Sequence, residues 1–108
     1  MANLVVSGKK IATCSALETC KRENNLPTIG AYSIIKDGRE RPVCVIRTTV
    51  IHLVSFTDVT EEMAKKEGEG DLSLSYWKKE HKNFFEREGT YSENMELVFE
   101  QFELIETV

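Results

Sequence analysis

The sequence predicts a single α+β domain, in which a small and mostly antiparallel β-barrel is flanked by helices. Three observations favour this fold class. Asp37-Gly38 lies between two runs rich in β-branched residues, which is a strong short-range signal for a β-hairpin. The run 43–56 is rich in β-branched residues and too long for one straight strand. The segment 73–89 carries apolar residues at helical spacing.

Size and composition are those of one soluble globular domain. The chain has 108 residues, of which 41% are hydrophobic and 30% are charged. Because a domain usually takes roughly 100 to 200 residues, we expect residues 1–108 to form one domain. No window reaches the ~18 consecutive apolar residues of a membrane span, and no basic leader precedes an apolar stretch. We therefore expect a cytoplasmic protein with no membrane partner.

The charge balance restricts the partners. The chain has 14 Lys and Arg against 18 Asp and Glu, for a net charge of -4. Domains that bind a nucleic-acid backbone are usually basic, so broad electrostatic binding of RNA or DNA is disfavoured. Net charge does not determine the charge of a small concave site. A nucleoside or a short single-stranded RNA therefore remains a possible ligand.

The first third of the chain gives weak signals. Residues 4–6 are a short apolar piece that ends at Ser7-Gly8, where glycine allows a turn at little steric cost. Residues 13–24 are predicted to form a weak helix. This helix must end before Leu26-Pro27, because proline disfavours the helical conformation in the residue before it.

The middle of the chain predicts strands. Residues 32–35 lead into the hairpin turn, and the return strand follows Pro42, where a missing N–H is tolerated. At ~3.3 Å per residue, the run 43–56 would span about 45 Å if it were straight. It must therefore bend or break. A strand that curls from one sheet edge to another is how a small barrel closes.

Two helices and a last strand complete the prediction. Asp58 and Thr60 are candidate N-caps for a short helix with an acidic first turn. A longer helix is predicted between Ser73 and Gly89, and residues 97–105 alternate enough to form the last strand. The apolar face of the longer helix, which we expect to pack in the core, consists of Leu74, Trp77, His81, Phe84 and Phe85.

The residues after Gly8 are the first candidates for chemistry. A glycine turn can place Lys9, Lys10 and Thr13 around a cleft, and a lysine beside a threonine can activate the hydroxyl as a nucleophile. The alternative is a solvated turn followed by a threonine that caps a helix, and spacing alone favours it. The segment is not a phosphate loop, which needs a second glycine and the order GK[ST].

An acidic segment supplies the second candidates. Glu67, Glu69 and Asp71 stand at alternate positions and could act as general acid or base, or ligate calcium. The twelve-residue calcium-loop pattern is absent, so we expect no metal, and surface acidity is the commoner explanation.

The histidines and cysteines favour structural roles. His81 is interpreted as a core histidine with one satisfied nitrogen, and His52 lies in the long strand with no third ligand spaced for zinc. The cysteines match neither a CxxC redox pair nor a zinc knuckle, so we expect reduced thiols. Cys14 as a nucleophile beside a histidine is the weaker alternative. The three cysteines are Cys14, Cys20 and Cys44.

Four segments resemble the ASCH-domain family: SGKKIATCS (7–15), LPTIGAYSIIKDGRERPVCVI (26–46), FTDVTEEMAKKEGEGDLSLSYWKKEHKNFF (56–85) and MELVFEQFEL (95–104). EGEGD followed by SLxxW and HxxFF is typical of one bacterial branch. The resemblance covers nearly the whole chain. It implies a fold similar to the PUA domain, a small β-barrel with flanking helices, which agrees with the curling strand.

The resemblance also implies a function. The family is associated with RNA binding, and one small branch hydrolyses the amide of N4-acetylcytidine. The family signature GxKxxExR appears here as Gly8, Lys10, Thr13 and Ser15. The amidohydrolase branch also has Thr in the third of these positions, and pairs it with the Lys and with the Glu of an AxxE sequence, here residues 64–67.

The roles implied are those of an amide hydrolase without a cofactor. Lys10 activates the Thr13 hydroxyl, which attacks the acyl carbonyl, and Glu67 passes the proton to the leaving amine. Ser15 stands where the family signature has Arg. The residues expected to bind substrate are Gly8, Lys9, Ser15, Glu69 and Asp71.

Members of this branch usually carry a longer N-terminal helical segment, whereas residues 1–7 alone precede the turn here. A truncated chain, a homodimer or a bound partner would each account for the difference. Two other functions stay open beside the hydrolase, namely a noncatalytic RNA-binding module and a domain for protein interaction only. Convergence of Lys10, Thr13 and Glu67 on one cavity would favour the hydrolase.

Overall fold

The structure is a computed structural model that describes residues 2–68 and 73–108. It has the predicted α+β composition, with antiparallel pairing throughout its sheet. In chain order the elements are α1 (Ala2–Val6), β1 (Ala12–Ala16), α2 (Leu17–Arg22), β2 (Tyr32–Lys36), β3 (Pro42–Ser55), the 3-10 helix η1 (Phe56–Asp58), α3 (Glu61–Glu67), α4 (Leu74–Glu88) and β4 (Glu96–Thr107).

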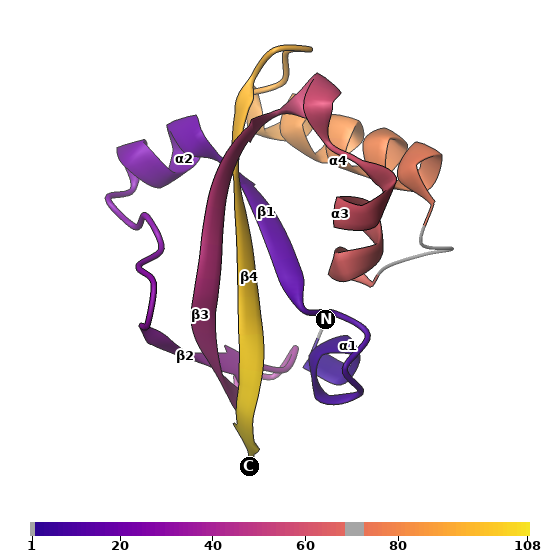
Figure 1. Ribbon diagram of the computed structural model, residues 1–108. Coiled ribbons are helices and arrows are strands. Elements are labelled where there is room, and N and C mark those ends of the chain that lie inside the picture. The colour runs from indigo at the N-terminus through magenta and orange to yellow at the C-terminus, as the bar shows by residue number, and fades with distance from the viewer. Residues whose placement is uncertain (1, 69–72) are drawn as a thin grey trace.

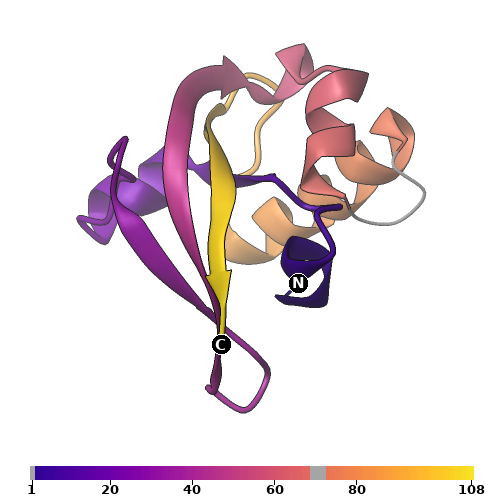
Figure 2. The ribbon, with the colours of Figure 1, turned by 60° about the horizontal axis from the view of Figure 1, so that its bottom comes forward.

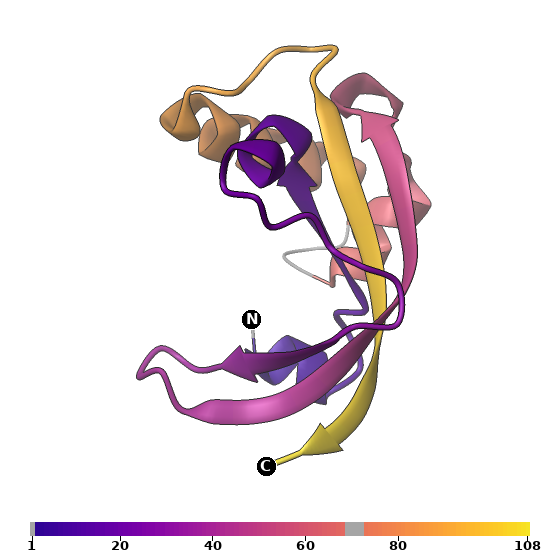
Figure 3. The same ribbon diagram turned by 90° about the vertical axis from the view of Figure 1, so that its left-hand side faces the viewer.

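One sheet of four strands, in the order β1-β4-β3-β2, forms the centre of the molecule. In the views of Figures 1 and 2, α2 lies to the left of the β3–β4 pair, and α3 and α4 lie to its right. The predicted long strand is confirmed, because β3 runs over 14 residues and pairs with both neighbours. The β3–β4 register shifts at Val45/Ile46 and at Thr48/Val50. Such irregularities bend a strand, and Figure 3 shows that the sheet curls into a half-barrel.

The predicted hairpin joins β2 to β3. The Asp37 carboxylate accepts hydrogen bonds from the backbone N–H groups of Arg39 and Arg41, at 2.8 and 3.1 Å. An aspartate that bonds its own turn in this way stabilises the reversal of the chain. The turn thereby sets the register of the long strand at its beginning.

Two apolar clusters hold the helices on the sheet. The smaller one packs Val5 of α1 against β3 and β4 through Cys44, Ile46 and Phe102. The larger one joins α3 and α4 to the sheet, and it buries Trp77 and Phe85 as the helical spacing predicts. Its buried members are Ala16, Phe56, Val59, Ala64, Trp77, Phe85 and Leu97.

The prediction of a helix over residues 13–24 was wrong in its first part. Residues 12–16 form β1, an edge strand that pairs with β4, and α2 begins only at Leu17. Ala12 and Ala16 are buried and point from β1 toward the core. They are small residues that give little strand signal in a sequence. Residues 4–6 belong to a short helix, α1.

The capping residues of the last two helices are those the sequence predicts. The Thr60 hydroxyl accepts from Met63 N at the start of α3, and the Ser73 hydroxyl accepts from Tyr76 N at the start of α4. Gly89 ends α4 in the left-handed conformation. Asp58, the other candidate cap, lies in η1 instead. Within the described ranges, no helix is long and apolar enough to cross a bilayer.

Candidate active site

Lys10, Thr13 and Glu67 line one pocket of about 400 Å³. They come from the turn before β1, from β1 itself and from the last residue of α3. Residues that are far apart in the sequence are therefore brought to a common cavity. The rest of the lining is supplied by Cys14, Glu80, His81, Phe84 and Arg87.

The backbone before β1 is held against the end of α3. Ile11 N donates to the carbonyl of Lys66 at 2.8 Å, which attaches the strand entry to the last turn of the helix. Gly68 follows that turn with φ +72, and a Cβ there would overlap the carbonyl group of Lys9 and come within 2.9 Å of Lys10 N. Only glycine fits this position. Its close approach to the backbone of Lys9 and Lys10 fixes the position from which the Lys10 side chain extends.

The Lys10 side chain is buried, with 3% of its surface exposed. Its Nζ donates to the backbone carbonyl of Glu67 at 3.4 Å. Carbonyl groups at the C-terminal end of a helix carry partial negative charge, so they stabilise a cation placed there. The lysine charge is thus fixed at the edge of the pocket, within the same small region as the Glu67 carboxyl.

Glu67 is the other buried charged residue of the pocket, at 1% exposure. Its Oε2 accepts a hydrogen bond from Trp77 Nε1 at 2.8 Å and lies 3.0 Å from His81 Nε2. Its Oε1 is buried and has no hydrogen-bond partner among the described residues. A buried polar atom without a partner is costly, so Oε1 is the atom that a ligand or substrate would satisfy.

His81 departs from the predicted role of a core histidine with one satisfied nitrogen. Its Nδ1 lies 2.9 Å from the Trp77 carbonyl and its Nε2 lies on Glu67, so both ring nitrogens have partners. The ring stacks on Trp77 with centroids 4.0 Å apart. It lines the pocket. Spacing placed His81 on the helix face next to Trp77, but could not show that a carboxyl from another helix meets it there.

Phe84 also departs from prediction. It is 45% exposed and lines the pocket, whereas its neighbour Phe85 is fully buried. Glu80, Phe84 and Arg87 lie at i, i+4 and i+7 of α4, which places them on one face of the helix. The sequence analysis missed Glu80 and Arg87 as site residues. Their spacing follows the same helical repeat that predicted the apolar face. That repeat does not show where the cavity lies.

The other predicted binding residues lie apart from this pocket. Gly8 and Lys9 are exposed in the turn and do not line it. Ser15 lines a different cavity of about 460 Å³, where the Thr48 hydroxyl donates to Glu100. Its assignment to the same binding site is therefore not supported by position. Glu69 and Asp71 lie outside the described residues.

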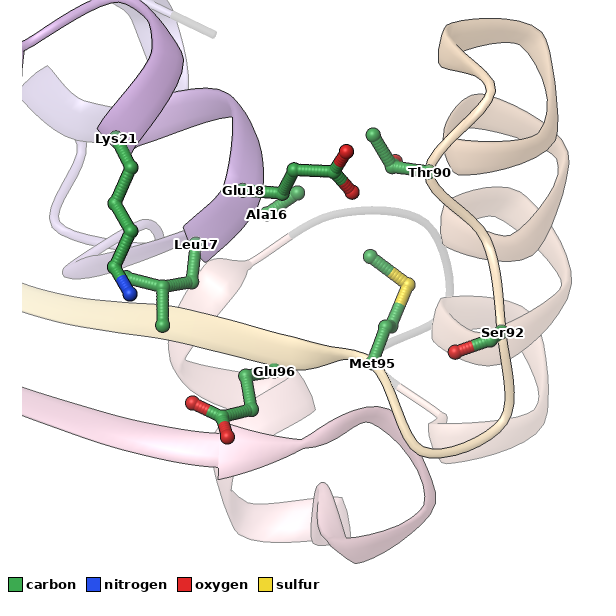
Figure 4. Close-up of a pocket in the computed structure, with 8 residues that line it drawn as sticks. All are labelled: Ala16, Leu17, Glu18, Lys21, Thr90, Ser92, Met95 and Glu96. Carbon is green, nitrogen blue, oxygen red and sulfur yellow. The ribbon is translucent and has the colours of Figure 1, made fainter.

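Two further cavities lack buried charge. The one in Figure 4, of about 400 Å³, lies between α2 and the start of β4, and its Glu18 and Lys21 are exposed. His52 lines a third, with Leu53 and Val54. Across residues 2–68 and 73–108, no group of three or more His, Cys, Asp or Glu residues is arranged to hold a metal ion.

Cys14 lies in the pocket wall, and all three cysteines are free thiols. Burial raises the pKa of the Cys14 thiol, the negative charge of Glu67 and a hydrogen bond between the thiol and the Glu67 side chain raise it further, and Lys10 opposes the shift. Because the thiolate is the reactive form, a raised pKa leaves little nucleophile near neutral pH. A catalytic role for Cys14 beside a histidine is disfavoured.

Slow alkylation of Cys14 is the expected consequence. With iodoacetamide near neutral pH, the folded protein should modify Cys14 at least about tenfold more slowly than the unfolded chain, and the rate should rise with pH. Glu67→Gln removes one cause of the raised pKa, so it should speed modification of Cys14 but not of Cys44, which peptide mass spectrometry can follow. Equal rates in the folded and unfolded chains would contradict the environment described.

Comparison with known proteins agrees with this fold. The ASCH domain family matches residues 1–106. The ASCH domain of Lactobacillus crispatus JV V101 is 34% identical, with a TM-score of 0.90 over 95% of this chain and 69% of that one. A protein of Enterococcus faecalis V583 is 39% identical, with a TM-score of 0.88 over 98% of this chain and 67% of that one. No curated protein matches the chain. The chain belongs to the ASCH-domain family.

Proposed function

We propose that this protein hydrolyses the amide bond of an N4-acylated cytidine in the pocket of Lys10, Thr13 and Glu67. One observation carries the proposal. A buried lysine, a buried glutamate and a threonine line the same pocket, although three different parts of the chain supply them. Charged side chains are rarely buried without a function or a partner, and these three are the groups that nucleophilic amide cleavage needs.

The proposed reaction begins with attack of Thr13 Oγ on the acyl carbonyl carbon. The hydroxyl proton passes to Glu67, and the charge of Lys10 stabilises the developing negative oxygen. The tetrahedral intermediate collapses when the carbon–nitrogen bond breaks, and Glu67 returns the proton to the leaving N4 amine. Cytidine leaves and the acyl group remains as an ester on Thr13. Water then attacks this ester in the same way, which releases the carboxylic acid and restores the hydroxyl.

The remaining pocket wall suits a pyrimidine nucleoside. A cavity of about 400 Å³ is within the usual range for small ligands. Phe84 offers an exposed aromatic face on which a flat base can stack, while Arg87 and Glu80 offer a donor and an acceptor on the same helix face. The enzyme would then recognise the base by contact and cleave the acyl group beside Thr13.

The direct test is incubation of the purified protein with N4-acetylcytidine. We expect equimolar release of cytidine and acetate, measured by liquid chromatography, and no release from Lys10→Met or Glu67→Gln. N4-acetylcytosine and a peptide amide serve as substrates that separate nucleoside recognition from general amidase activity. Binding of the nucleoside without release would instead support a noncatalytic ligand-binding module, and salt-dependent retention on single-stranded RNA would support RNA binding.

Phe84→Ala tests recognition of the base. We expect KM for N4-acetylcytidine to rise about tenfold, because base stacking on an aromatic ring contributes roughly 1–3 kcal/mol, with kcat changed much less. Tyr76→Ala is the matched control, since Tyr76 is an exposed aromatic of the same helix outside this pocket. Equal KM values for the two variants would remove Phe84 from the substrate site.

A further inference from the structure

The hydrogen bonds of His81 determine where one proton must lie. Nδ1 lies 2.9 Å from the backbone carbonyl of Trp77. A carbonyl oxygen only accepts hydrogen bonds, so Nδ1 carries a hydrogen. Whether Nε2 also carries a hydrogen depends on its contact with Glu67.

Nε2 lies 3.0 Å from Glu67 Oε2. If Nε2 were bare and the glutamate ionised, two lone pairs would face each other at hydrogen-bond distance. That arrangement is repulsive, so a proton lies between the two atoms. It belongs to an imidazolium and a carboxylate, or to a neutral imidazole and a carboxylic acid. In both cases the pair together is neutral and holds one exchangeable proton.

We infer that Glu67 and His81 form a dyad that holds one proton between Oε2 and Nε2, and that His81 is thereby a positioning residue that directs proton exchange with substrate to Oε1. The second half of this inference rests on the proposed function. Trp77 Nε1 donates to Oε2 at 2.8 Å, so that oxygen has two partners, whereas Oε1 has none among the described residues.

With this dyad, every proton in the proposed reaction has a donor and an acceptor. Attack requires the form in which Nε2 holds the shared proton, because Oε1 can accept the proton from Thr13 Oγ only while Glu67 is a carboxylate. After attack, Oε1 gives that proton to the leaving amine, and the dyad returns to its starting state. The other titratable or charged groups that line the pocket are Lys10, Cys14, Glu80 and Arg87. His81 itself contacts neither substrate nor the reacting carbonyl in this scheme, and it acts through Glu67.

The protonation of His81 can be measured without any substrate. In ¹⁵N-labelled protein, long-range proton–nitrogen spectra report which ring nitrogen carries hydrogen. We expect Nδ1 of His81 to be protonated near neutral pH, and Nε2 to show the shift of a protonated or strongly hydrogen-bonded nitrogen. In Glu67→Gln the Nε2 signal should move toward that of a bare nitrogen. The chain has 2 histidines, so His52→Gln assigns the signals. A bare Nε2 whose shift is the same in the parent and in Glu67→Gln would overturn the dyad.

Two substitutions separate positioning from packing. Phe at position 81 keeps an aromatic ring on Trp77 but cannot donate to Glu67, whereas Gln loses the stack and keeps an N–H donor. We expect His81→Phe to lower kcat by about 100-fold, since acid–base catalysis supplies roughly 10²–10⁴-fold, and His81→Gln to stay within about tenfold of the parent. If His81 only packed in the core, His81→Phe would lower kcat less than His81→Gln. That result would overturn the positioning role.

The two proposals fail in different ways. A parent protein that releases no cytidine would end the proposed function and, with it, the positioning role. The nitrogen spectra would still decide whether the shared proton exists. An active parent whose His81 Nε2 is bare and unaffected by Glu67→Gln would keep the hydrolase and remove the dyad.

Discussion

Thr13→Ala is expected to lower the rate of cytidine release from N4-acetylcytidine by at least about 10³-fold, because removing the nucleophile of a hydrolase eliminates the covalent route. Binding of the substrate should change little, since the change removes only a hydroxyl and a methyl group from the pocket wall. Thr13→Ser keeps the hydroxyl and should retain measurable activity. A purified Thr13→Ser variant with bound substrate, examined by intact mass spectrometry, should also show a transient acyl adduct.

Thr107→Ala is the matched control for this experiment. Thr107 is likewise a strand threonine, but it is exposed at the end of β4, away from the pocket. Its loss should leave turnover unchanged. Thermal unfolding of both variants shows whether either has lost structure. Full activity in Thr13→Ala would exclude the threonine as nucleophile, and a water-based mechanism using Glu67 would have to replace it.

Gly68→Ala is expected to be the most destabilising single-methyl change in the described part of the chain. Gly68 has φ +72, and a Cβ there would overlap the carbonyl group of Lys9. The left-handed conformation costs a non-glycine residue about 1–2 kcal/mol, and displacing packed backbone costs more. We expect the free energy of unfolding to fall by roughly 3–5 kcal/mol, a range reached only by severe packing defects.

Gly89→Ala separates the two causes. Gly89 caps α4 at φ +78 and has open space around the position of a Cβ, so only the conformational cost of about 1–2 kcal/mol applies. Urea denaturation of both variants measures the difference. Gly68→Ala should also move Lys10 and therefore reduce any activity in the fraction that stays folded. Equal destabilisation in the two variants would show that the contact between Gly68 and the segment before β1 is not tight.

Local signals predicted most of the elements correctly. The Asp-Gly turn, the β-branched run, the caps Thr60 and Ser73 and the helical apolar repeat each depend on residues close in sequence. The errors lie where a distant partner decides the conformation. Residues 13–16 were predicted as part of a helix because Cys14, Ser15 and Ala16 are small and give little strand signal, and only pairing with β4 makes the segment extended.

The candidate site shows the same division. The resemblance singled out Lys10, Thr13 and Glu67, and these three do line one pocket. It assigned Ser15 to the same site, yet Ser15 lines another cavity. His81 was interpreted as a core residue because a helical face in a sequence does not reveal which carboxyl will lie against it.

By itself, the sequence determined the α+β class, the order of most elements and the residue types available for chemistry, because periodicity, capping and turn preference act over a few residues. Only the tertiary structure decided that Glu67 Oε2 lies between Trp77 and His81, that Lys10 is buried at the end of α3, and that Phe84 faces the cavity. The physical reason is that a hydrogen bond or a buried charge depends on distances between atoms, and the packing of helices on a curled sheet sets those distances.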